Sequence, residues 1–233
     1  MRPLTIFRHI ACEGPGYLAD VLERHAVPWR LVRVDEGEGI PDTLDDSSGL
    51  VFMGGPMSVN DPLPWIEQEM RLIRMAQAAN FPVLGHCLGG QLISKALGGT
   101  ISANPVREIG WHSVRKCDTP AAASWLAGLP DENTLFHWHG ETFSIPDGAE
   151  VILESDHCAH QAFAIGNTLA LQCHIEMMTP MISEWAALYE HELQQTSATV
   201  QSAAQMTANL PARISAAQHV ADHVYQRWLT TLL

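Results

Sequence analysis

Apolar and polar positions follow two different periods along the first hundred residues. Compact apolar runs predict buried strands, and they lie at residues 4–7, 29–34, 50–53 and 81–84. Apolar residues at helical spacing predict helices at residues 17–25, at 64–79 and between Cys87 and Gly98. This alternation of strand and helix with short connections predicts a mostly parallel sheet that is covered by helices on both faces.

From Ile109 onward the apolar runs are shorter, and turns rather than helices separate them. Further strands are predicted at residues 111–114, 134–138, 151–153, 162–165 and 169–172. Gly166-Asn167 lies between the last two of these runs, which is a hairpin signal. This half of the chain is therefore expected to add antiparallel strands to the sheet.

Residues 179–233 are expected to be largely helical. Two apolar helix faces are predicted, one of Ile182, Trp185, Leu188 and Tyr189, the other of Ile214, Ala217, Val220, Val224 and Trp228. Residues 194–209 are rich in Ala, Gln, Ser and Thr, which predicts an exposed connection or a weakly anchored helix. We expect one domain over 1–233, with a core at about 1–178 and a helical C-terminal extension at 179–233. The predicted fold class is α/β, a three-layer sandwich with a mostly parallel, flavodoxin-like central sheet.

Composition limits the classes of binding partner and the cellular compartment that we expect for this protein. Thirteen Lys and Arg stand against 26 Asp and Glu, giving a formal net charge of −13. Such acidity argues against nucleic acid or an anionic membrane as the main partner. No apolar stretch approaches the length of a membrane span, and the N-terminus lacks the apolar region of a signal peptide. The five cysteines have no framework spacing, so we expect reduced thiols in a cytoplasmic protein.

The strongest candidate chemistry lies at Cys87. Gly85 precedes this cysteine and Gly89 and Gly90 follow it, between a predicted strand and a predicted helix. Such an elbow lifts a nucleophile clear of the sheet, and the helix N-terminus beneath the sulfur favours thiolate. The alternative is an ordinary buried, inert cysteine.

A nucleophilic cysteine needs a base, and His174 is the leading candidate. It follows the last predicted strand and is separated by one residue from Glu176. In an extended segment both side chains point the same way, so Glu176 is placed to orient the imidazole. The alternative is a solvated pair in a loop.

A second histidine pair is His137 and His139, which would share one face of a strand. This spacing fits two metal ligands, but the sequence offers no third ligand at a clear spacing. We therefore expect no metal here, and interpret the pair as a pocket wall or as two hydrogen-bonded core histidines.

Five motifs together resemble a known family, the class I (triad-type) glutamine amidotransferases. Residues 85–91 resemble its Gly-x-Cys-x-Gly-x-Gln nucleophile turn, and residues 54–56 (Gly-Gly-Pro) resemble its oxyanion turn. The other three matches are residues 139–141 (His-Gly-Glu), 155–163 and 172–176 (Gln-Cys-His-Ile-Glu). Order and spacing agree. The likeness is to the branch that contains the glutaminase domain of GMP synthetase and stand-alone γ-glutamyl peptidases.

The resemblance implies a role for each matching residue and no cofactor. Cys87 would attack the γ-carbonyl of a glutamine-like substrate, His174 would carry the proton, and Glu176 would orient His174. The backbone N–H groups of Gly55 and Leu88 would hold the oxyanion. Substrate binding would involve Gln91, Trp138, Gly140 and Glu141.

The sequence departs from the family pattern at two positions and leaves alternatives open. Ile175 stands where the family usually has proline, and Cys173 stands where it has phenylalanine. The first hypothesis is a stand-alone hydrolase of glutamine or another γ-glutamyl compound. The second is an ammonia-supplying subunit of a separate synthase, and the third a non-catalytic homologue that binds a metabolite. A different enzyme class with a cysteine elbow, similar to the intracellular-protease-like folds, ranks below these.

Overall fold

The computed structural model describes residues 2–232, so the expected limits at Met1 and Leu233 lie outside the described residues. A nine-stranded sheet runs through the molecule in the order β2-β1-β3-β4-β9-β8-β7-β5-β6. Its parallel part contains β2 (Trp29–Arg33), β1 (Leu4–Arg8), β3 (Leu50–Phe52), β4 (Val83–His86) and β9 (Thr168–Leu171). Its antiparallel part contains β8 (Ala162–Ile165), β7 (Glu150–Glu154), β5 (Ile101–Lys116) and β6 (Glu132–Phe143).

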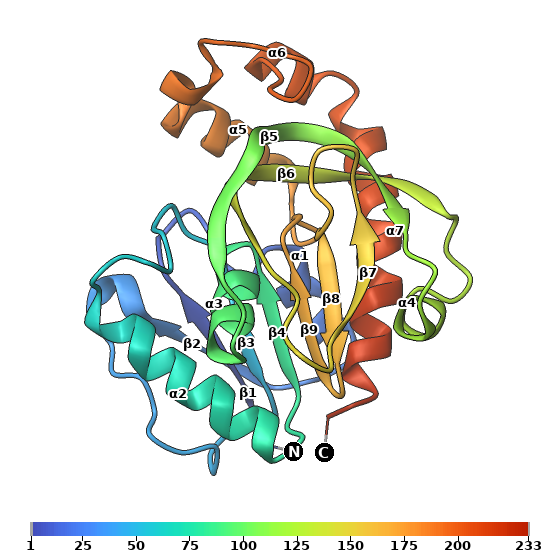
Figure 1. The fold of residues 1–233 in the computed structure, drawn as a ribbon. Coiled ribbons are helices and arrows are strands. Elements are labelled where there is room, and N and C mark those ends of the chain that lie inside the picture. The colour runs from blue at the N-terminus through green and yellow to red at the C-terminus, as the bar shows by residue number, and fades with distance from the viewer. Residues whose placement is uncertain (1, 233) are drawn as a thin grey trace.

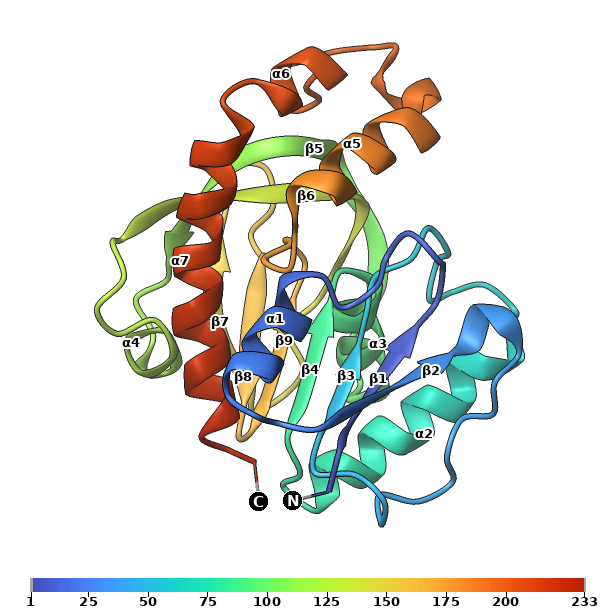
Figure 2. The same ribbon diagram turned by 180° about the vertical axis from the view of Figure 1, so that it is seen from behind.

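Helices cover both faces of the parallel strands (Figures 1 and 2). α2 (Pro64–Ala78) and α3 (Leu88–Ala96) lie on one face, and α1 (Tyr17–Arg24) and α7 (Leu210–Leu229) on the other. Strand side chains alternate between the two faces, so in β9 Leu169 and Leu171 join one buried cluster and Ala170 the other. The predicted three-layer α/β fold is confirmed, and so is the hairpin at Gly166-Asn167 between β8 and β9.

The antiparallel half is more extended than its apolar runs predicted. β5 and β6 form a long two-stranded ribbon that continues past the predicted strand at residues 134–138 to Phe143. Its register shifts between Ala103 and Glu108, where polar residues interrupt any alternation. A short helix, α4 (Pro120–Trp125), was not predicted. The ribbon curves over the carboxyl ends of the parallel strands (Figure 1).

The C-terminal region departs from two predictions. In α5 (Thr179–Leu188), Ile182 and Trp185 are buried as expected, but Leu188 is 55% exposed, so its assignment to the apolar face was wrong. Residues 194–209 are mostly exposed, as expected, but they are anchored more firmly than predicted because Val200 and Met206 are buried. Val200 bridges to Ile109, and α6 (Ala203–Thr207) buries Met206, whose carbonyl accepts a hydrogen bond from the Trp111 indole.

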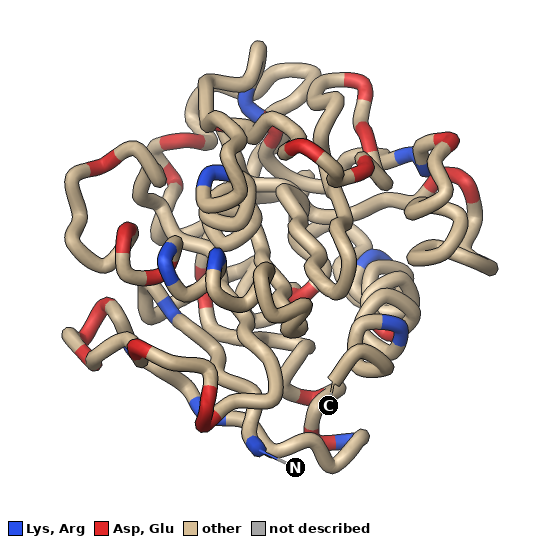
Figure 3. Tube along the Cα trace, turned by 60° about the horizontal axis from the view of Figure 1, so that its bottom comes forward, with Lys and Arg blue, Asp and Glu red and all other residues tan. Residues whose placement is uncertain are grey.

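The distribution of charged residues and the hydropathy of the helices can be compared with the expectations from composition. Acidic residues are spread along the chain with Lys and Arg scattered among them (Figure 3). Within residues 2–232 no helix is both apolar enough and long enough to cross a bilayer. All five cysteines are free thiols, as predicted.

Candidate active site

Cys87 stands at the sharp turn between β4 and α3. Its backbone has φ 48° and ψ −105°, a conformation that non-glycine residues rarely adopt. Its N–H donates to the carbonyl of Leu171 on the neighbouring strand β9, at 2.8 Å. A side chain at Gly89 would lie 2.0 Å from the Phe52 carbonyl oxygen, so only glycine lets α3 pack this close to the sheet. The predicted elbow is therefore present.

His174 follows β9, the strand that pairs in parallel with β4, so it lies at the same edge of the sheet as Cys87. Its Nδ1 donates to Glu176 Oε1 at 2.7 Å, and both side chains are buried. Burial alone would lower the pKa of His174, but the charge of Glu176 and the thiol of Cys87 outweigh it and raise the pKa well above its usual value. Burial opposes ionisation of Glu176 too, yet His174 and His86 lower its pKa.

The two departures from the family pattern leave the His174–Glu176 contact in place. Ile175 and Cys173 are both buried, and their side chains belong to the apolar cluster that contains α7. Burial, followed by the nearby charge of Glu176, raises the pKa of the Cys173 thiol. Cys173 is thus a buried neutral thiol, distinct from the pocket-facing Cys87.

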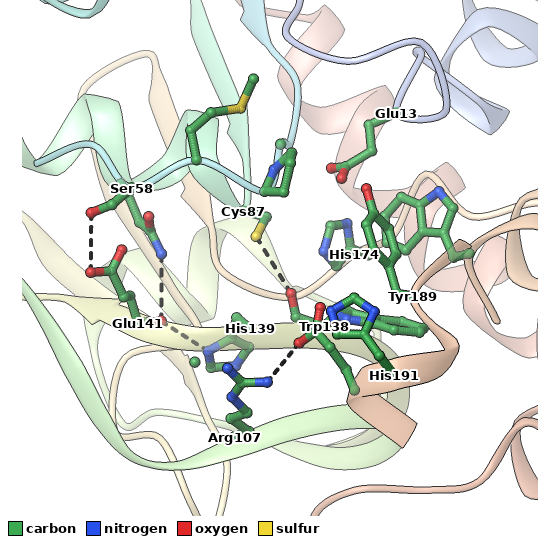
Figure 4. A pocket seen from close by; sticks show the side chains of 17 residues that line it. Glu13, Ser58, Cys87, Arg107, Trp138, His139, Glu141, His174, Tyr189 and His191 are labelled. Carbon is green, nitrogen blue, oxygen red and sulfur yellow. Dashed lines mark hydrogen bonds and ion pairs between the residues drawn. The ribbon is translucent and has the colours of Figure 1, made fainter. Parts of the chain in front are cut away.

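Cys87 and His174 line a common pocket of about 500 Å³ (Figure 4). His174 Nε2 has no hydrogen-bond partner among the described residues, which leaves it free for a proton that arrives from the pocket. Glu176 lies behind the imidazole, on the Nδ1 side. Cys87, His174 and Glu176 therefore lie together, and their roles as nucleophile, base and orienting carboxylate stay predictions.

Leu88 and Gly55, the two residues expected to supply oxyanion N–H groups, lie near the pocket that contains Cys87. Leu88 is the first residue of α3, and the N–H groups of a first helical turn have no carbonyl acceptor within the helix. Gly55 lines the pocket, and a side chain there would lie 2.9 Å from the Leu88 side chain. Gly55 therefore lies against the Leu88 side chain, and the role of their N–H groups as oxyanion donors stays a prediction.

Gln91 is connected to the nucleophile through a residue to which the sequence gave no role. Its Nε2 donates to Gln172 Oε1 at 3.1 Å and lies 3.4 Å from the Glu141 carbonyl oxygen. Gln172 Nε2 in turn lies 3.5 Å from Cys87 Sγ. This buried chain of amides fixes the floor of the pocket.

The ribbon strand β6 forms the wall opposite Cys87. The Trp138 carbonyl lies 3.9 Å from Cys87 Sγ, and Gly140 and Glu141 line the pocket. Glu141 Oε1 accepts a hydrogen bond from Ser58 at 3.1 Å. In Figure 4, Ser58 and Glu141 lie on one side of Cys87 and His174 on the other.

Sequence reasoning missed several residues of the pocket. Glu13, from the loop after β1, points into it on the side of His174 (Figure 4). Burial raises the pKa of Glu13 to about 7, and the charge of Glu176 adds to this while His174 and His9 oppose it. Arg107 pairs with Glu192 at 2.7 Å, linking β5 to the short helix η2 (Glu190–Leu193). No sequence signal distinguished these residues, because their loops and strands meet only in the fold.

His137 and His139 gain a third neighbour in the structure. Glu108 on β5 lies opposite His139 in the ribbon, and one ligand-type atom from each of the three residues lies within 4.8 Å of the others. Glu108 is 29 positions before His137 along the chain, and its place in the ribbon register is not visible in the spacing of residues.

Comparison with known proteins identifies the family of this chain. A family model described as glutamine amidotransferase class-I matches residues 17–183. The chain belongs to the class I glutamine amidotransferase family. It is 31% identical over 195 residues to the glutamine amidotransferase-like protein YfeJ of Salmonella typhimurium, covering 80% of each chain.

The chain also resembles part of a longer protein and the full length of two solved structures. The GMP synthase of Finegoldia magna is 34% identical over 133 residues, which is 55% of this chain and 24% of that protein. A glutamine amidotransferase structure from Methylobacillus flagellatus has a TM-score of 0.96 at 43% identity, covering 100% of this chain and 96% of that one. One from Thermotoga maritima has a TM-score of 0.88 at 25% identity, covering 98% of both.

Proposed function

We propose that this chain hydrolyses the γ-amide of glutamine or of a related γ-glutamyl compound through a thioester on Cys87. The observation that carries the proposal is one pocket that combines Cys87 at the elbow, the His174–Glu176 pair and the free helix N-terminus at Leu88. A nucleophile, a base and an orienting carboxylate are the parts that acyl transfer requires.

In the proposed reaction Cys87 Sγ attacks the γ-carbonyl carbon, and the thiol proton passes to His174 Nε2. His174 then gives this proton to the departing nitrogen, so the C–N bond breaks and ammonia or an amine leaves. Water next attacks the thioester as His174 takes its proton, and glutamate is released with the thiol restored. The oxyanion of both tetrahedral intermediates is held by the N–H groups of Gly55 and Leu88, where each donor is worth about 3 kcal/mol. The scheme uses only this chain's own groups and water.

The wall on the Ser58 side is proposed to bind the glutamyl part. Glu141 offers a carboxylate to the α-ammonium group, and Arg107 is the cationic residue of the lining suited to the α-carboxylate. Gln91 supports the wall from below through the Glu141 carbonyl. Trp138 and Gly140 complete this wall, and the absence of a side chain at Gly140 leaves the backbone open to substrate.

The side of the pocket near Glu13 is proposed to hold the leaving group. A volume of about 500 Å³ lies in the range of pockets that take drug-sized ligands, so there is room for more than ammonia. Glu13 and Tyr189 line this side (Figure 4). These features favour a γ-glutamyl compound with an organic amine as leaving group over glutamine itself.

A glutaminase subunit for a separate synthase is the second candidate. It is favoured by the relatives named GMP synthase, of whose length this chain spans about a quarter. Such a subunit would be slow alone and strongly stimulated by its partner. Full activity of the isolated chain, with no synthase recovered in a pull-down, would remove this candidate.

The first test is the intact mass of the protein after exposure to an electrophilic glutamine analogue. We expect one adduct on the wild type, blocked by excess glutamine or γ-glutamyl substrate and absent from Cys87→Ala. Cys158→Ala is the matched control, because Cys158 is buried away from the pocket lining and its removal should leave the adduct in place. An adduct that persists in Cys87→Ala would overturn the assignment of the nucleophile.

The second test compares kcat/KM for glutamine with that for γ-glutamyl anilides and γ-glutamyl dipeptides. We expect the larger leaving groups to be preferred. Equal or lower kcat/KM for them would favour glutamine and the ammonia-supplying role.

A further inference from the structure

A cluster of buried ligand-type side chains lies in the ribbon behind the pocket wall. Glu108 stands on β5 and His137 and His139 on β6, with Glu108 opposite His139 and Gly110 opposite His137. All three side chains are buried, and one ligand atom from each lies within 4.8 Å of the others. The reaction proposed for Cys87 uses none of the three.

The ring of His139 contacts a backbone carbonyl with one nitrogen and faces Glu108 with the other. Its Nδ1 is 2.9 Å from the Glu141 carbonyl oxygen, which can only accept, so Nδ1 carries the hydrogen. Nε2 is 3.0 Å from Glu108 Oε2, yet the ring makes no hydrogen bond in that direction. A backbone carbonyl that holds the far nitrogen is the usual outer support of a metal-binding histidine.

His137 supplies the independent observation. It is fully buried, and neither of its ring nitrogens has a hydrogen-bond partner in the described part of the chain. A buried polar atom without a partner is unfavourable, and a metal ion between the rings would give one of these nitrogens a partner.

Glu108 is held from outside the cluster as metal-binding carboxylates are. Ser155 Oγ donates to its Oε1 and Gln161 Nε2 donates to its Oε2, each at 2.7 Å. Both supporting side chains are themselves buried. The carboxylate is thus fixed in orientation while it faces two imidazoles.

We propose that Glu108, His137 and His139 bind a divalent transition-metal ion of the zinc class. Two imidazoles and one carboxylate form a ligand set that Zn²⁺ takes when it keeps one further position for water. Bond lengths of about 2.0–2.2 Å place the ligand atoms of a tetrahedral site closer together than 4.8 Å, so binding requires these side chains to move toward one another. His139 also lines the active-site pocket, which gives the ion a route in. The ion would fix the wall from Trp138 to Glu141.

The test measures zinc binding to the tag-free chain, stripped with a chelator, in competition with a chromophoric chelator. All measurements use a background protein that carries both Cys87→Ala and His219→Ala. The first substitution removes the thiol of the proposed site, and the second breaks up the pair His219 and His223, which lie one helical turn apart on α7. Both are competing metal ligands. We expect one ion per chain with a dissociation constant below about 1 μM, and a higher melting temperature with zinc. Co²⁺ should give visible bands of a nitrogen and oxygen ligand set.

Glu108→Gln and His137→Gln keep nearly the same volume and remove one ligand each. Each should weaken zinc binding at least about 100-fold and abolish the rise in melting temperature. Unchanged binding in His137→Gln would overturn the proposal. So would an absence of micromolar binding in the background protein, a result that does not depend on the folding of either ligand variant. The cluster would then be a buried His139–Glu108 contact beside a His137 without a partner.

Discussion

Three side chains at the active site are held in states that are unfavourable elsewhere in a protein. Cys87 has a positive φ, which costs about 1–3 kcal/mol for a residue other than glycine. His174 and Glu176 are a buried pair whose pKa values move apart, the histidine upward and the carboxyl downward. Each of these costs is offset by the packing around the elbow and serves to aim a reactive atom into the pocket.

Loss of the Glu176 charge should affect catalysis far more than folding. In Glu176→Gln the amide still fills the space but no longer favours the imidazolium or one tautomer of His174. We expect kcat/KM to fall by up to about 10⁴-fold, the size of the corresponding change in a serine triad. The loss is measured by steady-state hydrolysis and by the rate of Cys87 alkylation in the wild type and in Glu176→Gln.

Glu184→Gln on α5 is the control, since that carboxylate is exposed and outside the pocket lining. It should leave both rates within twofold. If Glu176→Gln also retains its rates, Glu176 does not orient the base.

The ionisation of Glu13 should make the free energy of unfolding depend on pH in a predictable direction. Its pKa rises from 4.5 to about 7 on folding, so between these values the folded chain binds more protons than the unfolded chain. Stability should therefore fall as pH rises from about 4.5 to about 7. The shift of about 2.5 units sets an upper limit of about 3 kcal/mol.

Glu13→Gln should remove this dependence, because the amide does not ionise. Urea unfolding should find the variant more stable than the wild type at pH 8 by about 1–3 kcal/mol, and nearly equal to it at pH 4. The other groups that face this carboxyl, His174, Glu176 and His9, are unchanged in the comparison. An equal difference at both pH values would contradict the raised pKa.

A buried ion pair connects α2 to the turn that carries Gly55. His9 Nε2 lies 3.0 Å from Glu69 Oε2, and His9 Nδ1 lies 3.0 Å from the Met53 carbonyl oxygen. Both partners of the ring are acceptors, so the ring donates from both nitrogens and is charged. Burial opposes this, but the Glu69 charge outweighs it and raises the pKa of His9. The pair thus holds the proposed oxyanion turn against the helix.

Glu69→Gln should weaken both stability and turnover. Removing one partner of a buried pair costs about 3 kcal/mol. Because the folded pKa of His9 is raised, this stabilisation is fully present below about pH 6.5 and is lost at higher pH as His9 deprotonates. We expect kcat to fall about 10-fold or more with little change in KM, since the oxyanion forms only after binding. A loss of stability with unchanged kcat would mean that the pair supports the fold alone.

The sequence predicted those elements whose pattern is local. The elbow, the His174–Glu176 spacing and the helix face of α7 depend on neighbouring residues, and all three are present. Glu108 and Glu13 were missed because strand register and loop placement bring them to the site, and neither is encoded in residue spacing. The anchoring of residues 194–209 was missed for a similar reason, since a largely polar composition hides the buried Val200 and Met206.

The C-terminal helices complete the hydrophobic core and reach the site. α7 runs along one face of the sheet (Figure 2) and buries Trp228 and Tyr225 completely. Tyr225 Oη is 2.9 Å from Nε2 of His86, the residue before the nucleophile, and the same nitrogen is 3.9 Å from Glu176 Oε2. A boundary near residue 178 therefore cuts through one continuous apolar cluster rather than between a core and an appendage.

A chain that ends after Met178 should fail to form a specifically packed structure. It would expose the apolar cluster to which α5 and α7 contribute, and apolar burial at about 25 cal/mol per Å² is the main favourable contribution to folding. We expect weak near-UV circular dichroism, binding of a hydrophobic dye and no alkylation of Cys87 that substrate can block. Trp228→Ala in the full chain is the milder test and should lower the free energy of unfolding by about 3–5 kcal/mol. The opposite result would be cooperative unfolding and substrate-protected alkylation of Cys87 in the truncated chain. It would show that residues 1–178 form the site alone, and that neither Tyr225 nor the face of α7 is needed to hold His86 and Glu176 in place.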